Sequence, residues 1–389
     1  MPADLEAHLS EKLALLRSQH RFRDPADAGA RGLVERAAAA AGVAFVDASS
    51  NDYLGMAAEP GGVSRETSRP GAGAARLVQG SWPEHESLER ELADWVGQAQ
   101  SLLFASGYAA NLGTIAALSE PDSVVLSDEL NHASIIDGCR LGRGKTVVVP
   151  HLDLRALEGA LQDAANARAR WVVTESYFSM DGDGPDLRAV RELCDRYGAF
   201  LVVDEAHALG LFGKQGAGRC EEARIQADAL VGTFGKSIGT HGAFVAGSTS
   251  LRTFLWNRAR SFVFSTAPSP QLCALTLRHV KTVRTADAKR AAVLRAALRL
   301  RSKLEDARVP MVPGSFGPII GLLAGTSARA MAVAHSLREA GILAQAIRAP
   351  TVPEGRARIR LTVTARASDP QVDRVVECVI RSWGESCGA

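Results

Sequence analysis

Short apolar runs rich in β-branched residues alternate with helical patterns through the middle of this 389-residue chain. Six of these runs are predicted strands: residues 101–104, 123–126, 146–149, 171–175, 200–203 and 230–233. Amphipathic stretches at 154–161 and 187–197 are typical of helices between strands. Strands that are apolar on both faces and alternate with helices predict an α/β fold with a mostly parallel sheet, covered on both sides.

The pattern changes toward the C-terminus. The helices and strands predicted there lie at 286–307, 318–324, 327–340, 359–364 and 370–383. This mixture predicts a smaller α+β domain. Leucines at helical spacing from Leu5 to Leu16 predict an N-terminal surface helix. We therefore expect an N-terminal helix and arm at 1–60, a large domain at 61–285 and a small C-terminal domain at 286–389.

The composition narrows the possible partners. The chain has 46% hydrophobic and 23% charged residues, and its formal net charge of +2 predicts no basic surface for nucleic acid. Its six cysteines include no CxxC pair and no cluster with histidine at metal-ligand spacing, so we expect reduced thiols and no metal. No apolar run approaches the roughly 20 residues that span a bilayer. Without a signal peptide either, the sequence predicts a cytoplasmic protein with no membrane partner.

Polar residues follow four of the predicted strands, at 127–128, 175–179, 204–207 and 233–236. The carboxyl ends of parallel strands meet at one edge of a sheet, and α/β proteins bind their ligands outside that edge. We therefore expect the functional site where these four segments come together.

Two short motifs at this edge allow a nucleotide interpretation. Residues 204–207 read Asp-Glu-Ala-His, like the magnesium-binding box of a helicase, and residues 235–237 read Gly-Lys-Ser, like the end of a phosphate-binding loop. That loop requires another glycine five residues earlier, but the position is Leu230. A second match, Gly-Lys-Thr at 144–146, has Cys139 in the required place. The spacing therefore argues against a nucleotide site.

The same residues also allow a Schiff-base interpretation, in which a lysine holds pyridoxal phosphate. Lys236 would be that lysine, and Asp204, at the end of a buried strand, would keep the pyridine nitrogen protonated. A helix that opens within 106–111 and the hydroxyl of Thr233 would bind the phosphate, and the segment 131–134 would cover the ring. Each residue alone has a structural explanation, such as a helix cap for Asp204. Their joint position at one sheet edge favours the cofactor site.

A series of stretches, in order along the chain, carries a family resemblance. They are 50–55, 71–77 with Gly80, 106–111, 131–138, 178–183, 204–207, 232–236, 264–266, 350–353 and 358–362. Together they resemble the α-oxoamine synthases, a family of pyridoxal-phosphate enzymes with the fold-type-I transferase fold. The resemblance runs from about Arg21 into the C-terminal domain.

The resemblance implies a role for most residues of the site. Lys236 would form the Schiff base and carry protons, Asp204 would pair with the ring nitrogen, and His132 would stack on the ring. His207 would bond to the phenolic oxygen of the cofactor, together with Ser179. Lys236, Asp204, His132 and His207 are therefore the predicted catalytic residues. The resemblance assigns the phosphate or the ring to Gly107, Tyr108 and Thr233.

The resemblance also implies the substrates. Arg360 would bind the amino-acid carboxylate through its planar guanidinium, and Arg21 and Thr351 match substrate-contacting positions. The reaction would be a decarboxylative condensation of L-alanine with a pimeloyl thioester, carried on coenzyme A or on acyl carrier protein. Glycine with acetyl-CoA or succinyl-CoA is the alternative, because departures from the family pattern leave the acyl specificity open. A homodimer is implied, in which Ser265 and Thr266 reach the phosphate of the other subunit.

Overall fold

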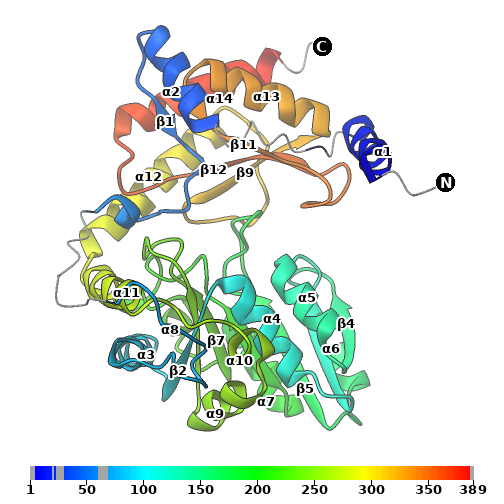
Figure 1. The fold of residues 1–389 in the computed structure, drawn as a ribbon. Helices are drawn as coiled ribbons and strands as arrows, with labels where there is room; N and C mark the ends of the chain where they lie inside the picture. The colour runs from blue at the N-terminus through cyan, green and yellow to red at the C-terminus, as the bar shows by residue number, and fades with distance from the viewer. Residues whose placement is uncertain (1–4, 20–21, 23–29, 60–68, 386–389) are drawn as a thin grey trace. The chain divides into compact units, whose positions relative to one another are not determined.

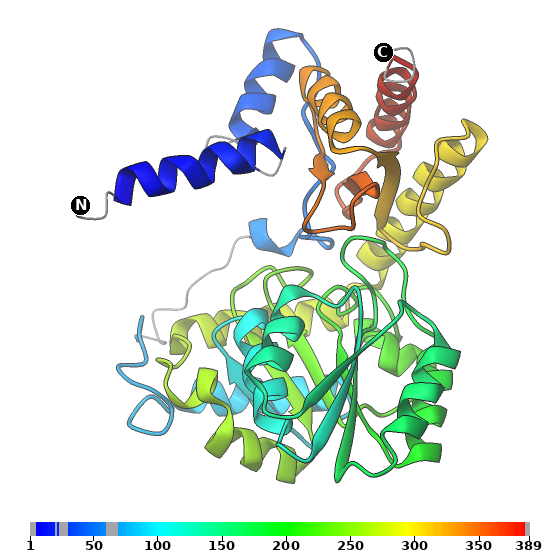
Figure 2. The same ribbon diagram turned by 90° about the vertical axis from the view of Figure 1, so that its right-hand side faces the viewer.

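The computed structural model describes residues 5–19, 22, 30–59 and 69–385 (Figures 1 and 2). The chain divides into two compact units. The large unit is formed by residues 51–179 and 183–292, and the small unit by residues 1–50, 180–182 and 293–389. The domain boundaries expected after residues 60 and 285 stay predictions.

A seven-stranded sheet forms the centre of the large unit, in the order β2-β8-β7-β6-β5-β3-β4. Its strands are β2 (Gln100–Phe104), β3 (Ser123–Asp128), β4 (Lys145–Val149), β5 (Ala169–Glu175), β6 (Phe200–Asp204), β7 (Ala229–Thr233) and β8 (Ala243–Gly247). Only β8 runs against its neighbours, and the other strand pairs are parallel. The predicted strands and the mostly parallel sheet are confirmed, whereas β8 was not predicted. Six carboxyl ends therefore share one edge.

Helices cover the faces of this sheet (Figure 1). On one face a core of residues such as Val173 and Val202 packs under α4 (Gly107–Leu118), α5 (Ala133–Leu141), α9 (Thr249–Arg258) and α10 (Arg260–Val263). α6 (Leu154–Asp163) and α7 (Leu187–Tyr197) lie over the alternate residues of the strands, such as Leu126 and Val172. Further helices of this unit are η2 (Met56–Ala58), α3 (Pro83–Trp95), η3 (Lys214–Gly216), α8 (Arg219–Ala223) and α11 (Pro270–Arg284).

The ends of the helices follow from capping residues in the sequence. The Asp186 carboxylate accepts the N–H groups of Arg188 and Ala189, at 3.0 and 3.1 Å, and begins α7. The helix ends at Gly198, whose φ of 59° is a left-handed conformation that favours glycine. Asp153 caps α6 in the same way. Both predicted helices are confirmed, and no described helix is at once long and apolar enough to cross a membrane.

The small unit has a three-stranded antiparallel sheet in the order β11-β12-β9. Its strands are β9 (Ile319–Gly325), β11 (Gln345–Ile347) and β12 (Ala357–Thr362), and a separate parallel pair joins β1 (Val46–Asp47) to β10 (Ile342–Leu343). The helices are α1 (Leu5–Ser18), α2 (Ala30–Ala40), most of α12 (Asp287–Asp306), α13 (Ser327–Glu339) and α14 (Asp369–Glu385). The predicted α+β character is confirmed, and the short β1, β10 and β11 were not predicted.

A buried ion pair stabilises the small unit. Arg358 on β12 and Asp181 are 1% and 5% exposed, and Nη1 of the arginine lies 2.6 Å from Oδ1 of the aspartate. The guanidinium also donates to the carbonyl oxygens of Met180 and Arg356. A buried charge is tolerated only when it is paired and hydrogen-bonded. This pair therefore fastens the segment 180–182 to β12.

Replacing Asp181 with alanine is expected to lower the free energy of unfolding by about 3–5 kcal/mol, because the Arg358 guanidinium stays buried without a carboxylate. Urea denaturation followed by circular dichroism measures this change. Glu35→Ala is the matched control, since it removes only the exposed Arg31–Glu35 pair of α2, and we expect a loss below about 1 kcal/mol. Equal losses in the two variants would contradict the role of burial.

Candidate active site

A cavity of about 180 Å³ lies at the carboxyl edge of the large unit's sheet. It is lined by Gly107, Tyr108, Asn111, His132, Ser134, Glu175, Asp204, Ala206, His207, Thr233 and Lys236. These residues follow or end five different strands of the sheet. The four predicted catalytic residues are brought together here, and so are all the predicted cofactor-binding residues except Ser179.

Lys236 lies on the turn that follows β7. Phe234 anchors this turn, because its buried ring stacks on Phe244 of β8 with a centroid distance of 5.8 Å. The N–H of Phe234 also donates to the carbonyl oxygen of Gly242 at 2.9 Å. The half-buried lysine is thus placed at the cavity by a turn that is fixed on both sides.

Asp204 is a buried carboxylate at the end of β6, with 7% of its surface exposed. Its Oδ2 accepts the amide N–H of Asn111 at 2.7 Å, and its Oδ1 accepts the N–H of Ala206 at 2.8 Å. Both carboxylate oxygens are thus hydrogen-bonded to N–H groups. Within the described ranges no lysine, arginine or histidine nitrogen forms an ion pair with it. A buried anion that faces a cavity without an ion pair fits a ligand cation, such as a protonated pyridine nitrogen.

His207 is held from behind by a tyrosine. Its Nδ1 lies 2.8 Å from the hydroxyl of Tyr53, a residue with 0% exposure. The same hydroxyl lies 3.3 Å from Oδ1 of Asn51. Tyr53, from the 50–55 stretch, therefore fixes the position of the His207 ring.

Glu205, the second residue of the Asp-Glu-Ala-His motif, has a different surrounding. Its carboxylate accepts the hydroxyl of Ser176 at 2.6 Å and the N–H groups of Arg219 and Cys220 at 3.0 and 2.6 Å. It is fully buried and stabilises the loops around it. Among the described residues, no group of three histidine, cysteine or acidic side chains is arranged to hold a metal ion.

His132 stands at the N-cap of α5, where its Nδ1 lies 2.7 Å from the hydroxyl of Ser134. Its backbone N–H donates to Oε1 of Glu175 at 2.7 Å. The ring keeps an exposed surface toward the cavity, but the surrounding protein withholds water and holds the pKa of His132 below its usual range. The Asp204 charge opposes this shift and the Lys236 charge adds to it. A neutral imidazole ring therefore faces the cavity.

An anion site adjoins these residues. α4 begins at Gly107 with Ser106 as its N-cap, so its first N–H groups and its helix dipole favour a negative charge. A Cβ atom on Gly107 would lie 3.5 Å from Cβ and Oγ1 of Thr233, which shows that the helix start lies against this threonine. Tyr108 is 44% exposed, and its hydroxyl donates to Asp137. A helix N-terminus beside a hydroxyl fits a phosphate group.

The other predicted site residues are not among the described residues that line this cavity. Ser179 is buried and is not one of the described residues that line the cavity. Arg360, on β12 of the small unit, is 3% exposed, and Thr351 of the same unit is exposed. Arg21 lies outside the described residues. The roles expected for these four residues stay predictions.

Three polar residues of the cavity, Asn111, Ser134 and Glu175, had no role of their own assigned from the sequence. Glu175 pairs in register with Asp204 on the neighbouring strand, so both side chains lie on the same face of the sheet. Its position at a strand end was the signal that could have identified it. Asn111 follows Gly107 by four residues in α4, and helical periodicity places both on the same side of the helix.

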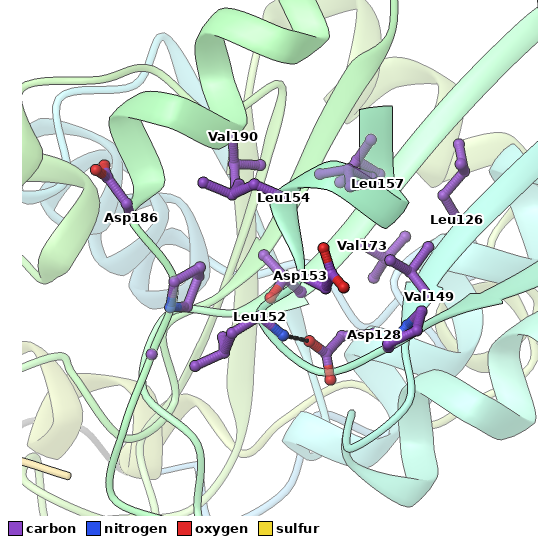
Figure 3. A pocket seen from close by; sticks show the side chains of 15 residues that line it. Leu126, Asp128, Val149, Leu152, Asp153, Leu154, Leu157, Val173, Asp186 and Val190 are labelled. Carbon is purple, nitrogen blue, oxygen red and sulfur yellow. Dashed lines mark hydrogen bonds between the residues drawn. The ribbon is translucent and has the colours of Figure 1, made fainter. Parts of the chain in front are cut away.

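A second cavity, of about 190 Å³, lies on the face of the sheet that α6 and α7 cover (Figure 3). Its lining is mostly apolar and comes from β3, β4, β5, α6 and α7. The carboxylates of Asp153 and Asp186 cap α6 and α7, and Asp128 accepts the N–H of Leu152 at 3.1 Å. Since backbone groups already use these carboxylates, the cavity that holds Lys236 is the candidate active site.

The fold and the active-site cavity together define a class of enzyme. A largely parallel α/β sheet carries, at one edge, a lysine, a buried carboxylate without an ion pair and a helix N-terminus beside a hydroxyl. This is the arrangement of the fold-type-I enzymes that use pyridoxal phosphate. The chain belongs to the aminotransferase class I and II family, whose sequence model matches residues 44–379.

The chain is also similar to individual proteins of this family. A protein from Anaeromyxobacter dehalogenans named 8-amino-7-oxononanoate synthase is 46% identical over 340 residues, which is 85% of each chain. A solved serine palmitoyltransferase from Sphingomonas wittichii is 28% identical, with a TM-score of 0.87 over 99% of each chain. Another, from S. paucimobilis with a bound PLP–myriocin aldimine, is 27% identical, with a TM-score of 0.85 over 89% of each chain. The predicted fold-type-I transferase fold is confirmed.

Proposed function

We propose that this chain is an 8-amino-7-oxononanoate synthase of biotin biosynthesis. It would join L-alanine to the pimeloyl group of a thioester carried on coenzyme A or on acyl carrier protein. One carbon–carbon bond forms at the α-carbon of alanine, the alanine carboxylate leaves as carbon dioxide, and the carrier leaves as a free thiol. The observation that carries this proposal is that Lys236 and Asp204 line one cavity of a chain that is 46% identical to a protein of that name.

Different residues of the cavity would bind different parts of the cofactor. Asp204 would bind the ring nitrogen, His132 would cover the ring, and His207 and Ser179 would bond to the phenolic oxygen. The phosphate would lie at the start of α4, against Gly107, Tyr108 and Thr233. When bound, pyridoxal phosphate serves as an electron sink for negative charge at the α-carbon of the amino acid.

Lys236 would move the proton in this reaction. Its Nζ would bind the cofactor before the amino acid arrives, and would then take the α-proton of alanine. The nitrogen must be unprotonated to do so. The turn anchored by Phe234 holds the amine at the cavity.

The substrate carboxylate would be bound by Arg360, with Arg21 and Thr351 as further substrate contacts. A guanidinium presents two parallel N–H groups that match the two oxygens of a carboxylate. The backbone of β12 supports this assignment, because it gives Arg360 an ordered and buried starting point. An ordered side chain loses less entropy when it binds.

We also propose a homodimer in the cytoplasm. Leu141 and Phe264 are 62% and 72% exposed, and both line one hollow of about 660 Å³ on the large unit. Large apolar side chains that gather on a surface favour a contact with another protein chain. A second copy of this chain would bury them, with Ser265 and Thr266 next to Phe264 in the sequence.

A matrix of substrates tests the proposal. We expect L-alanine with pimeloyl-CoA or pimeloyl acyl carrier protein to give the highest kcat/KM among alanine, glycine and serine combined with pimeloyl, acetyl, succinyl and palmitoyl thioesters. One methyl group in a fitted pocket changes kcat/KM by about 10–200-fold, which sets the expected preference for alanine over glycine. Release of the carrier thiol and mass spectrometry of the product measure turnover.

Two outcomes of the same matrix would contradict the proposed function. Turnover of glycine with acetyl-CoA or succinyl-CoA, with none of alanine and a pimeloyl thioester, would assign the chain to a different α-oxoamine synthase. Turnover of serine with a palmitoyl thioester alone would place it with the serine palmitoyltransferases that share its fold. Each reaction is run without the amino acid as a control for hydrolysis of the thioester.

A further inference from the structure

Two carboxylates stand side by side at the active-site edge. Glu175 ends β5 and Asp204 ends β6, and the two residues pair in register across these parallel strands. Paired residues place their side chains on the same face of a sheet. Both are buried, with 3% and 7% of their surfaces exposed, and both line the cavity that holds Lys236. The proposed function uses only Asp204 as an anion.

The protein treats these two acids differently. Asp204 accepts an N–H group at each oxygen, from Asn111 and from the backbone of Ala206. Glu175 accepts the backbone N–H of His132 at one oxygen, Oε1, at 2.7 Å. Hydrogen bonds from N–H groups stabilise the ionised form of a carboxylate. Asp204 therefore has two N–H donors for its carboxylate, and Glu175 has one.

The charges that face Glu175 act in the same direction. Burial and the negative charge of Asp204 raise the pKa of Glu175 to about 8, and Asp128 adds a smaller upward effect. Lys236 and the N–H of His132 oppose the rise without cancelling it. A carboxyl group whose pKa is raised holds its proton below that value and loses it as the pH increases through it.

We propose that Glu175 is an uncharged positioning residue of the active site, which holds the backbone of His132 and leaves Asp204 as the single negative charge of the pair. A second anion at this edge would favour a protonated Lys236, and a protonated amine cannot take the α-proton of the amino acid. A neutral carboxyl group still accepts an N–H through its carbonyl oxygen. Glu175 thus fixes the residue that covers the cofactor ring without adding charge. This inference deepens the proposed function and rests on it for the roles of Lys236 and His132.

The infrared spectrum of the enzyme with bound pyridoxal phosphate tests the charge of Glu175 directly. The carbonyl stretch of a protonated carboxylic acid should be present at about pH 6 and should disappear as the pH rises, because burial raises the pKa of Glu175. Glu175→Gln should lack this band, and Glu192→Gln, at an exposed position of α7, should keep it. Absence of the band from the wild-type enzyme at about pH 6, where a buried acid is protonated, would overturn the proposal.

Two substitutions at the same position test the positioning role. Glu175→Gln keeps an uncharged acceptor, so kcat at about pH 7 should stay within about threefold of the wild-type value. Glu175→Ala leaves the buried N–H of His132 without an acceptor, and kcat should fall about tenfold or more. Equal losses in both variants would mean that the charge of Glu175 is needed, and would overturn the proposal.

The readouts separate this inference from the proposed function. The infrared band and the absorption spectrum of the bound cofactor require no substrate. If alanine and pimeloyl thioesters gave no turnover, the band of Glu175 would still decide its protonation state. If the substrates turned over and the band were absent, the proposed reaction would be supported and the role proposed for Glu175 would be wrong.

Discussion

Replacing Lys236 with alanine is expected to lower kcat by about 10³-fold or more. Of the described residues that line the cavity, Lys236 is the one with a primary amine. In the proposed function its loss would remove both the group that binds the cofactor covalently and the group that takes the α-proton. Steady-state turnover measures the second effect. Mass spectrometry after borohydride reduction measures the first, because the cofactor mass should stay on the wild-type chain and be absent from the variant.

Lys214→Ala is the matched control for this substitution. Lys214 is exposed on η3, and it is not among the described residues that line the cavity. The variant should keep the wild-type kcat and the covalently retained cofactor. A Lys236→Ala protein that still retained the cofactor mass after reduction would show that another amine holds it, and the assignment of Lys236 would be wrong.

The sheet could be predicted where strands are apolar on both faces. β6 shows the reason, since Leu201, Val202 and Val203 are all buried and the pattern is a continuous apolar run. β8 lacks that signal, because its sequence Ala-Phe-Val-Ala-Gly is short and contains small residues. Its direction depends on pairing with both β2 and β7, which are far apart in the chain. Such long-range pairing cannot be inferred from local pattern.

The site could be predicted where a residue follows a strand, and not where it acts through a partner. Lys236 and Asp204 were identified by their chemistry at strand ends. Tyr53 behind His207, and Asn111 beside Asp204, depend on contacts between residues 154 and 93 positions apart in the sequence. No spacing rule connects residues at such distances. Their contribution became visible only from the positions of their atoms.

Replacing Asp204 with asparagine would remove its negative charge and keep nearly the same side-chain shape. Asn111 and the backbone N–H of Ala206 each donate to one of its oxygens, and an asparagine in the same place would keep an oxygen for one of these two bonds. The fold should therefore survive the substitution, while the ionic interaction with a protonated ring nitrogen would not. Charge-assisted hydrogen bonds are roughly twice as strong as neutral ones. The effect of the charge can thus be measured apart from the effect of shape.

Asp204→Asn is expected to lower kcat by about 10²–10³-fold, because the cofactor ring loses the anion that stabilises its protonated nitrogen. Turnover and the Kd of pyridoxal phosphate, measured by absorbance titration, report this loss. Asp153→Asn is the control, since asparagine caps a helix about as well as aspartate, and both values should stay unchanged. The infrared band of Glu175 gives a further readout: without the Asp204 charge to repel, Glu175 should lose its proton at a lower pH than in the wild-type enzyme. An Asp204→Asn enzyme with the wild-type kcat and cofactor Kd would contradict the pairing of this carboxylate with the ring.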